Sequence, residues 1–311
     1  NFTSERDVVK EEYRQSILAP PYGRFGYLLQ QESFLKHPYR RPTIGSIEDL
    51  DAASLAEVQS FHSTYYRPDN ATLVVVGDFD QKQLNEWVYK YFASIPKATT
   101  PLPRVNITEP ARLKERRVIE YGSNVPLPAV GITYLTPSLR SADSDALRVA
   151  QWILNVGESS RLYHSLVYEQ QVAQSADASQ TLLEDVSLFS FSAVAASGRK
   201  LEAVEAALLA EITKMQTEPV KKSELDKAIN QILTYKLQNR ETNEGKATAL
   251  GTATVIYGDP ERVNTDLDNL KAVTAADVQN VMKKYFAREN RLVLYYLSET
   301  EKKSGAGAKV K

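Results

Sequence analysis

The chain contains an internal repeat, in which one segment recurs 220 positions later without a gap. Residues 50–70 and 270–290 share seven identical residues in 21 positions. The identical pairs are Leu50/Leu270, Ala52/Ala272, Ala56/Ala276, Val58/Val278, Gln59/Gln279, Tyr65/Tyr285 and Asn70/Asn290. No other feature of the sequence constrains the fold as strongly, because each copy of a repeat forms the same structural unit. We therefore expect two homologous units.

Each copy of the repeat predicts a capped helix followed by a strand. Ser54 with Glu57, and Thr274 with Asp277, have the spacing of a capping box, and an apolar run follows each helix. If one unit spans about 220 residues, the second runs from near residue 106 to near residue 300. The first unit would then begin about 100 residues before Asn1. We therefore expect the back half of one unit followed by one whole unit.

Hydrophobic periodicity places the remaining elements along the chain. We expect a first helix over 5–17 with Ser4 and Asp7 as cap residues, and a loop-rich stretch over 20–42. The other predicted helices are 54–66, 80–93, 142–155, 160–169, 200–217, 222–238, 243–256, 260–271 and 274–287, and the predicted strands are 71–77, 115–121, 128–134, 172–180, 186–197 and 291–297. This order predicts an α+β fold, with two homologous units of mainly antiparallel sheet, helices packed on one face, and the first unit incomplete.

Prolines mark the boundary between the two predicted units. Pro96, Pro101, Pro103 and Pro110 fall within one short stretch, which is typical of a linker. We divide the chain into the back half of a first unit (1–100), a Pro-rich linker (101–114), a complete second unit (115–300) and a disordered tail (301–311).

Composition excludes several kinds of site and partner. The chain has no cysteine, which rules out disulfides, thiolate metal sites and a cysteine nucleophile. Its histidines are His37, His62 and His164. A formal net charge of −1 argues against nucleic acid as a partner, and no apolar run is long enough to be a transmembrane segment.

Three segments resemble the pitrilysin/insulinase family of zinc metallopeptidases, the inverzincins. They are Tyr66–Phe79, Glu5–Glu12 and Gly157–Leu162, and the likeness is to bacterial members similar to mitochondrial processing peptidase. In this family the two histidines of an H-x-x-E-H motif and a glutamate on a later helix hold zinc, with water in the fourth position. The resemblance implies Zn²⁺ as the cofactor of the parent protein.

The resemblance assigns roles to four positions. Glu12 corresponds to the third zinc ligand, and Glu5, on the same helix face, corresponds to an acid that orients the site without binding the metal. Position 12 maps by the repeat onto Ile232, so we expect a non-catalytic second unit. Many relatives place an Arg and a Tyr that grip the substrate at positions equivalent to Val167 and Gln174. Neither residue present here can replace them.

The sequence has no H-x-x-E-H motif, and we assign no catalytic residue to this chain. We interpret His37, His62 and His164 as packed or exposed histidines rather than as metal ligands. We therefore expect the chain alone to bind no zinc tightly and to be inactive.

For the parent protein, the resemblance implies a zinc-dependent metalloendopeptidase that cleaves unfolded, extended peptides. This chain would belong to the zinc-side subunit, working with a homologous partner subunit that bears Arg/Tyr, or through self-association. The alternatives are a non-catalytic structural homologue and a scaffold that binds peptides by strand addition. The joint presence of Glu5 and Glu12 favours the peptidase. A tyrosine-rich, cysteine-free composition favours the bacterial periplasm, with the cytoplasm and the mitochondrion as alternatives.

Overall fold

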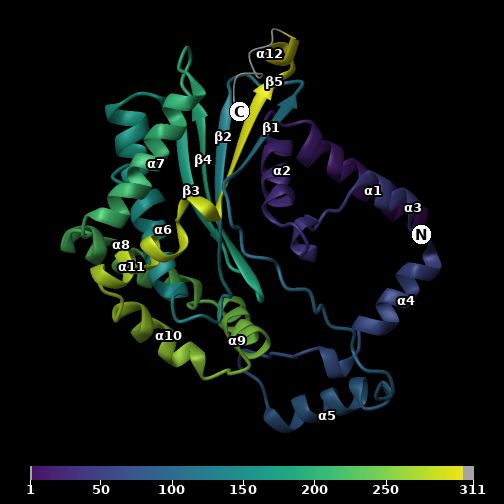
Figure 1. Ribbon diagram of the computed structural model, residues 1–311. Coiled ribbons are helices and arrows are strands. Elements are labelled where there is room, and N and C mark those ends of the chain that lie inside the picture. Colours follow the sequence, from purple (N-terminus) through teal and green to yellow (C-terminus); the bar gives the residue numbers. More distant parts are fainter. Residues whose placement is uncertain (1, 304–311) are drawn as a thin grey trace.

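The centre of the molecule is a β-sheet, and the computed structural model describes residues 2–303 around it (Figure 1). Within these residues the strands form one five-stranded sheet in the order β1-β5-β2-β4-β3. The strands are β1 (Arg116–Gly122), β2 (Ala129–Pro137), β3 (Ala173–Thr181), β4 (Val186–Ala195) and β5 (Arg291–Ser298). β1 pairs with β5 in parallel, whereas the other three pairings are antiparallel. The predicted α+β fold with a mainly antiparallel sheet is confirmed.

One face of the sheet is covered by helices from the second half of the chain, on the left in Figure 1. Side chains alternate along β5, so Val293 and Tyr295 enter the core beneath these helices, where Leu154 and Leu208 are also fully buried. These helices are α6 (Ser144–Asn155), α7 (Leu201–Thr217), α8 (Lys222–Asn239), α10 (Arg262–Lys271) and α11 (Ala275–Tyr285), and α9 (Asn243–Tyr257) packs against α10. Their bounds agree with those of the predicted helices to within about two residues.

The opposite face of the sheet carries α2 (Gly23–Ser33), which we did not predict. Phe25, Leu28 and Leu29 have the spacing of one helix face and pack against Leu294 and other residues on this side of the sheet. A close approach is possible because β2 has a glycine, Gly131, where a Cβ atom would lie 2.7 Å from the Leu29 side chain. The predicted loop over 20–42 was therefore wrong between 23 and 33, and helices lie on both faces rather than one.

The rest of the first half packs loosely by comparison. The α-helices are α1 (Phe2–Tyr13), α3 (Ile47–Ala52), α4 (Leu55–Tyr65) and α5 (Gln81–Phe92), and none of them contains a buried residue. A π-helical turn, Arg14–Leu18, continues α1. The predicted caps of the first helix were wrong, because Ser4 and Asp7 lie inside α1 rather than at its start.

The internal repeat is reproduced in the structure. α4 and α11 begin and end at equivalent residues, and both open with the predicted capping box. The repeated asparagine makes the same local hydrogen bond in each copy, from Asn70 Nδ2 to the Tyr65 carbonyl at 2.9 Å and from Asn290 Nδ2 to the Tyr285 carbonyl at 2.7 Å. Within the described residues, Asn290 makes two hydrogen bonds that Asn70 does not: its side-chain amide donates to the Leu135 carbonyl in β2 and accepts from the Leu135 N–H.

The predicted strand over 71–77 was wrong. These residues form no strand pairing, and Leu73 and Val75 are 60% and 41% exposed. The residues 220 positions later, Val293 and Tyr295, lie in β5 between β1 and β2 and are 1% and 3% exposed. A strand exists only where another strand satisfies its backbone, and residues 2–303 offer 71–77 no such neighbour.

Short elements complete the described chain. One-turn 3₁₀ helices span Pro38–Arg40, Pro68–Asn70 and Arg288–Asn290, and a π-helical segment spans Tyr163–Glu169. α12 (Glu299–Lys303) covers the first residues of the predicted tail, and the remainder of that tail lies outside the described residues. Over the described part of the chain, every helix is too short or too polar to cross a lipid bilayer.

A partly buried ion network joins the start of β1 to β5 and α7. The Glu115 carboxylate accepts from Arg117 Nε and from Arg291 Nε, both at 2.7 Å. Arg117 also pairs with Glu205 of α7, and that carboxylate accepts a hydrogen bond of 2.5 Å from the Tyr295 hydroxyl. Burial on its own would raise the pKa of Glu115, but the hydrogen bonds and charges of the two arginines outweigh it and lower that pKa.

This network predicts a pH dependence of stability. The pKa of Glu115 is lower in the folded than in the unfolded chain. The ionised carboxylate therefore contributes fully to the free energy of unfolding above about pH 4.3, and this contribution is lost as the pH falls through the lowered pKa. Glu115→Gln should therefore reduce the free energy of unfolding at pH 7 and flatten its decline between about pH 5 and pH 3. Denaturant titrations across this range measure it, with the exposed Glu158→Gln as control. Parallel pH profiles for wild type and Glu115→Gln would contradict the assignment.

Candidate functional site

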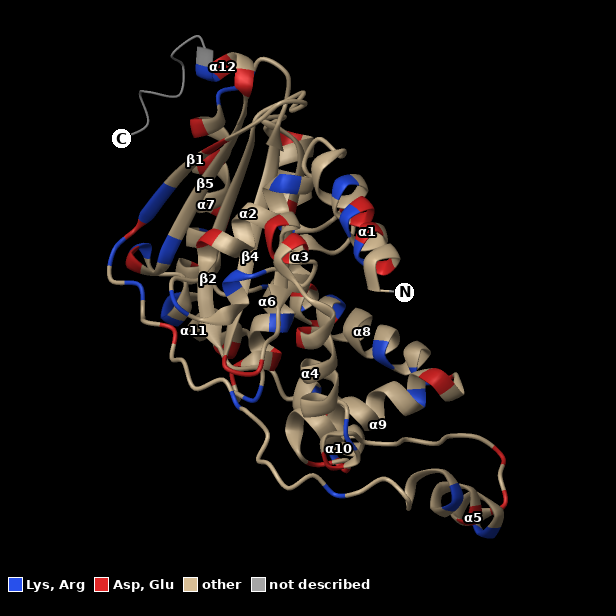
Figure 2. Ribbon diagram, turned by 90° about the vertical axis from the view of Figure 1, so that its right-hand side faces the viewer, with Lys and Arg blue, Asp and Glu red and all other residues tan. Residues whose placement is uncertain are grey.

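Glu12, the proposed metal ligand, and Glu5, its proposed supporting acid, lie on α1, and contacts of the other face of this helix set its orientation. Tyr13 packs edge-on against Tyr27 of α2, with ring centroids 6.0 Å apart, and Lys10 pairs with Asp51 of α3. The Lys10 side chain is 14% exposed, so its stem is covered while its charge is neutralised. These contacts hold one face of α1 against the protein and leave the other outside, where Figure 2 shows charged residues along the helix.

Glu5 and Glu12 both lie on the outer face of α1 and are exposed. Among residues 2–303 neither carboxylate makes a hydrogen bond or ion pair with another side chain, whereas neighbouring Glu11 accepts from Arg14 and Gln15. About 10 Å of helix rise separates Glu5 from Glu12. That spacing suits one ligand and one supporting acid better than two ligands of one ion.

The positions predicted to correspond to the family's Arg and Tyr lie in the second half of the chain. Val167 is in the π-helical segment and packs against the main core, where its side chain has no hydrogen-bonding group. Gln174 is exposed in the edge strand β3, at an irregularity in its pairing with β4 between Ala173 and Ser175. Neither position presents a cation or a phenol.

The three histidines lie on different elements, and among the described residues none belongs to a group of three or more metal-ligating side chains. His62 is on the exposed side of α4, stacked 4.8 Å from the Tyr66 ring. His164 Nδ1 lies 3.5 Å from the Glu169 carboxylate, because the π-helical segment brings residues five apart together. Within residues 2–303 no group of three or more His, Cys, Asp or Glu side chains could hold a metal.

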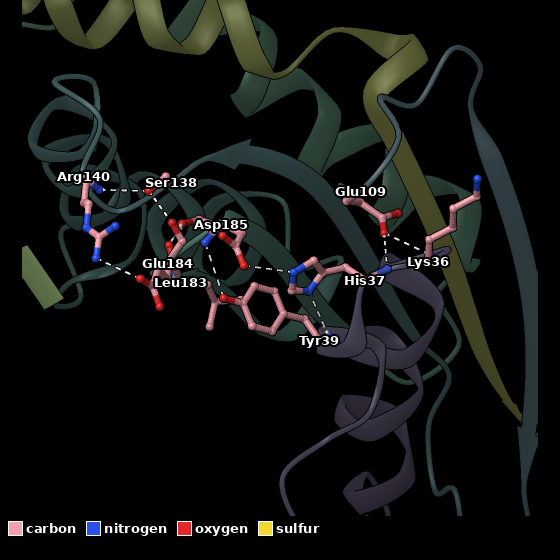
Figure 3. A network of polar contacts seen from close by, with 10 residues as sticks. Lys36, His37, Tyr39, Glu109, Ser138, Arg140, Leu183, Glu184 and Asp185 are labelled. Atoms are coloured by element: carbon pink, nitrogen blue, oxygen red, sulfur yellow. Dashed lines mark hydrogen bonds and ion pairs between the residues drawn. The ribbon is translucent and has the colours of Figure 1, made fainter. Parts of the chain in front are cut away.

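His37 is the buried histidine, 1% exposed, and it sits in a polar network that joins the two halves of the chain (Figure 3). Its Nδ1 accepts from the Tyr39 N–H at 3.2 Å, which leaves Nε2 as the donor to Asp185 at 3.1 Å. Asp185 lies between β3 and β4, and its own N–H approaches the Tyr39 hydroxyl at 3.4 Å. The network therefore fastens the segment after α2 to the β3–β4 turn.

Glu109, in the predicted linker, holds the same segment from its other side (Figure 3). Its carboxylate accepts the backbone N–H groups of Leu35, Lys36 and His37 at 2.7, 3.0 and 2.8 Å. Three successive N–H groups directed at one carboxylate form a strong, charge-assisted anchor. Nothing in the sequence around Glu109 indicated this role.

We predict that Glu109→Gln destabilises the chain by about 1–3 kcal/mol, since the amide has one acceptor oxygen and its NH₂ group would face N–H donors. The free energy of unfolding from denaturant titration measures the change. Glu86→Gln, on the exposed side of α5, is the matched control. Equal stability of the two variants would refute the anchor.

The comparison with family models gives a direct match. The model for the peptidase M16 inactive domain matches residues 52–232, more than half of the chain. The chain belongs to this family. Its matched region includes the 167 and 174 positions and leaves α1, with Glu5 and Glu12, outside.

Known relatives of this M16 chain include peptidases and peptidase subunits. It is 31% identical over 232 residues to zinc protease PqqE of Helicobacter pylori, which covers 74% of this chain and 52% of the relative. It is 24% identical over 267 residues to a probable mitochondrial-processing peptidase subunit beta of Arabidopsis thaliana, covering 83% and 50%. The crystal structure of a protease from Helicobacter pylori superposes with a TM-score of 0.89 at 26% identity, covering 95% of this chain and 71% of that one.

The M16 chain spans about half the length of these curated relatives. Relatives named zinc proteases support zinc as a metal of the family. In this chain, the exposed and unengaged carboxylate of Glu12 fits one zinc ligand, whereas the described residues as a set do not provide a complete site.

Proposed function

We propose that this chain is part of the zinc-side subunit of a metalloendopeptidase that cleaves unfolded peptides in extended conformation. The observation that carries the proposal is the pair of exposed carboxylates of Glu5 and Glu12 on the outward face of α1, neither of which bonds to another described side chain. Bound zinc would supply an activated water for peptide hydrolysis. In that site Glu12 would bind the metal, and Glu5 would orient the ligand set by hydrogen bonding.

The second half of the proposal concerns the partner. At positions 167 and 174 the chain has Val and Gln in place of the Arg and Tyr that the family resemblance leads us to expect. We therefore propose that a homologous subunit bearing Arg/Tyr completes the active enzyme, as an assembly of two related chains. The proposed compartment is the bacterial periplasm, which the cysteine-free composition supports.

The test uses the parent protein with its own upstream sequence, in parallel with the 311-residue chain. We expect the parent to bind one zinc ion per chain and to cleave an unfolded fluorogenic peptide when its Arg/Tyr-bearing homologue is added. The shorter chain should do neither. Metal content by mass spectrometry and cleavage rates, each with and without the homologue, are the readouts.

Two outcomes would overturn the proposal. A parent that binds no zinc would support the alternative of a non-catalytic structural or peptide-binding homologue. A parent that cleaves peptides equally well without its homologue would refute the division of the site between two chains.

A further inference from the structure

A cavity of about 540 Å³ lies among α6, α8, α9 and α10, in the second half of the chain. The wall formed by α9 carries Gly245, Ala249 and Ala253 toward the cavity, so no large side chain fills it from these positions. The other lining residues include Arg148, Lys236 and Asp266, so charged side chains distinguish this cavity from a packing defect of the apolar core.

Two cations lining the cavity share one carboxylate. Lys236 Nζ and Arg240 Nη2 both donate to Asp266 Oδ2, each at 2.6 Å, and Arg240 also donates to the Val263 carbonyl at 2.8 Å. Because Lys236 is a triple donor, two of its N–H groups have no acceptor within residues 2–303. Burial, together with the positive charge of Arg148, lowers the pKa of Lys236.

Two further guanidinium groups line the same cavity without a carboxylate partner. Arg148 of α6 makes no hydrogen bond or ion pair within the described residues, although it is partly buried. Arg262 of α10 lies over the Tyr257 ring at 4.0 Å, a contact that fixes the side chain but accepts none of its N–H groups. Such a surplus of guanidinium donors without carboxylate partners suits a planar or tetrahedral oxyanion.

We propose that this cavity binds a compact oxyanion, a phosphate or carboxylate group, between Arg148 and Arg262 with Lys236 as an additional donor. Asp145 and Glu244 also line the cavity, so the net positive charge is small and favours a single compact group over an extended polyanion. The site is separate from α1 and does not depend on the proposed peptidase activity.

The experiment titrates the 311-residue chain with inorganic phosphate at constant ionic strength and follows the phosphorus NMR line width. A second titration compares a short peptide bearing a free C-terminal carboxylate with its amide, which distinguishes the two sources of oxyanion. We expect saturable binding of phosphate, of the free-acid peptide, or of both. Arg148→Gln and Arg262→Gln should each weaken it about tenfold.

Arg104→Gln is the matched control, because Arg104 is an exposed arginine of the linker outside the cavity. Circular dichroism must show the same helix content for all variants. Absence of saturable binding by the wild-type chain, or equal binding by the cavity variants and Arg104→Gln, would overturn the proposal.

Discussion

Replacing Arg112 with methionine is expected to cost about 3–5 kcal/mol of folding free energy, one of the two largest effects that we predict. Arg112 Nη1 donates to the carbonyls of Thr133 and Asn290 at 2.8 and 3.0 Å, and Nη2 donates to the Ser33 carbonyl at 2.7 Å. One side chain thus joins α2, β2 and the turn before β5. Methionine keeps the length of the stem and leaves three backbone acceptors without their donor.

The charge of Arg112 also matters. Burial and the neighbouring Arg116 lower the pKa of Arg112 to about 10, so it remains protonated at neutral pH and its hydrogen bonds are charge-assisted. The free energy of unfolding from denaturant titration measures the loss. Arg104→Met, in the exposed part of the linker, should change it by less than about 0.5 kcal/mol. A difference of less than about 1 kcal/mol between the two variants would contradict the role assigned to Arg112.

The elements that could be predicted from the sequence are those whose signals are local. The capping boxes of α4 and α11 are set by residues three apart, and the apolar stripes of α6 and α7 by residues three or four apart. Such signals survive in any tertiary context that buries one face of a helix. The repeat added a long-range constraint, because it required both copies to form the same helix and turn.

α2 was missed because its local signals conflict. Prolines and glycines around its start predict a turn, yet Phe25, Leu28 and Leu29 carry a helical spacing that the sequence did contain. Burial of these residues on the sheet outweighs the weak propensity of the segment. Its partner surface depends on Gly131, more than 100 residues later, and no local pattern could reveal that pairing.

The prediction of a strand over 71–77 was wrong although its local signal is strong. Its β-propensity is high, but propensity describes how well a residue fits a sheet that already exists. The equivalent β5 is a strand because β1 and β2 flank it. The anchoring roles of Glu109 and Arg112 were likewise invisible, since each is defined by backbone groups distant in sequence. At the candidate metal site, the sequence predicted that Glu5 and Glu12 share a helix face, whereas their roles rest on family resemblance and stay predictions.

In the parent protein, Glu12→Gln is expected to weaken zinc binding by more than about 100-fold, because it removes a direct ligand, and even groups that merely support ligands cost about 10–100-fold. Glutamine keeps the length and helix propensity of the side chain but has no negative charge with which to neutralise the metal. Peptide cleavage should fall in parallel with zinc occupancy and recover in part at high zinc concentration. Competition with a chelator measures the affinity, and cleavage is followed at several zinc concentrations.

Glu11→Gln is the control that separates ligation from charge. Glu11 is adjacent to Glu12 on α1, is also exposed, and carries the same charge, but its carboxylate is engaged by Arg14 and Gln15 at 3.2 and 3.0 Å. If zinc is held by the general negative potential of α1, both variants should lose affinity equally, since both remove one charge at a similar position. If Glu12 is a ligand, Glu11→Gln should retain affinity within about threefold while Glu12→Gln does not. Equal zinc affinity for the two variants would remove Glu12 from the metal site, because a coordinate bond depends on one particular carboxylate and a surface potential does not.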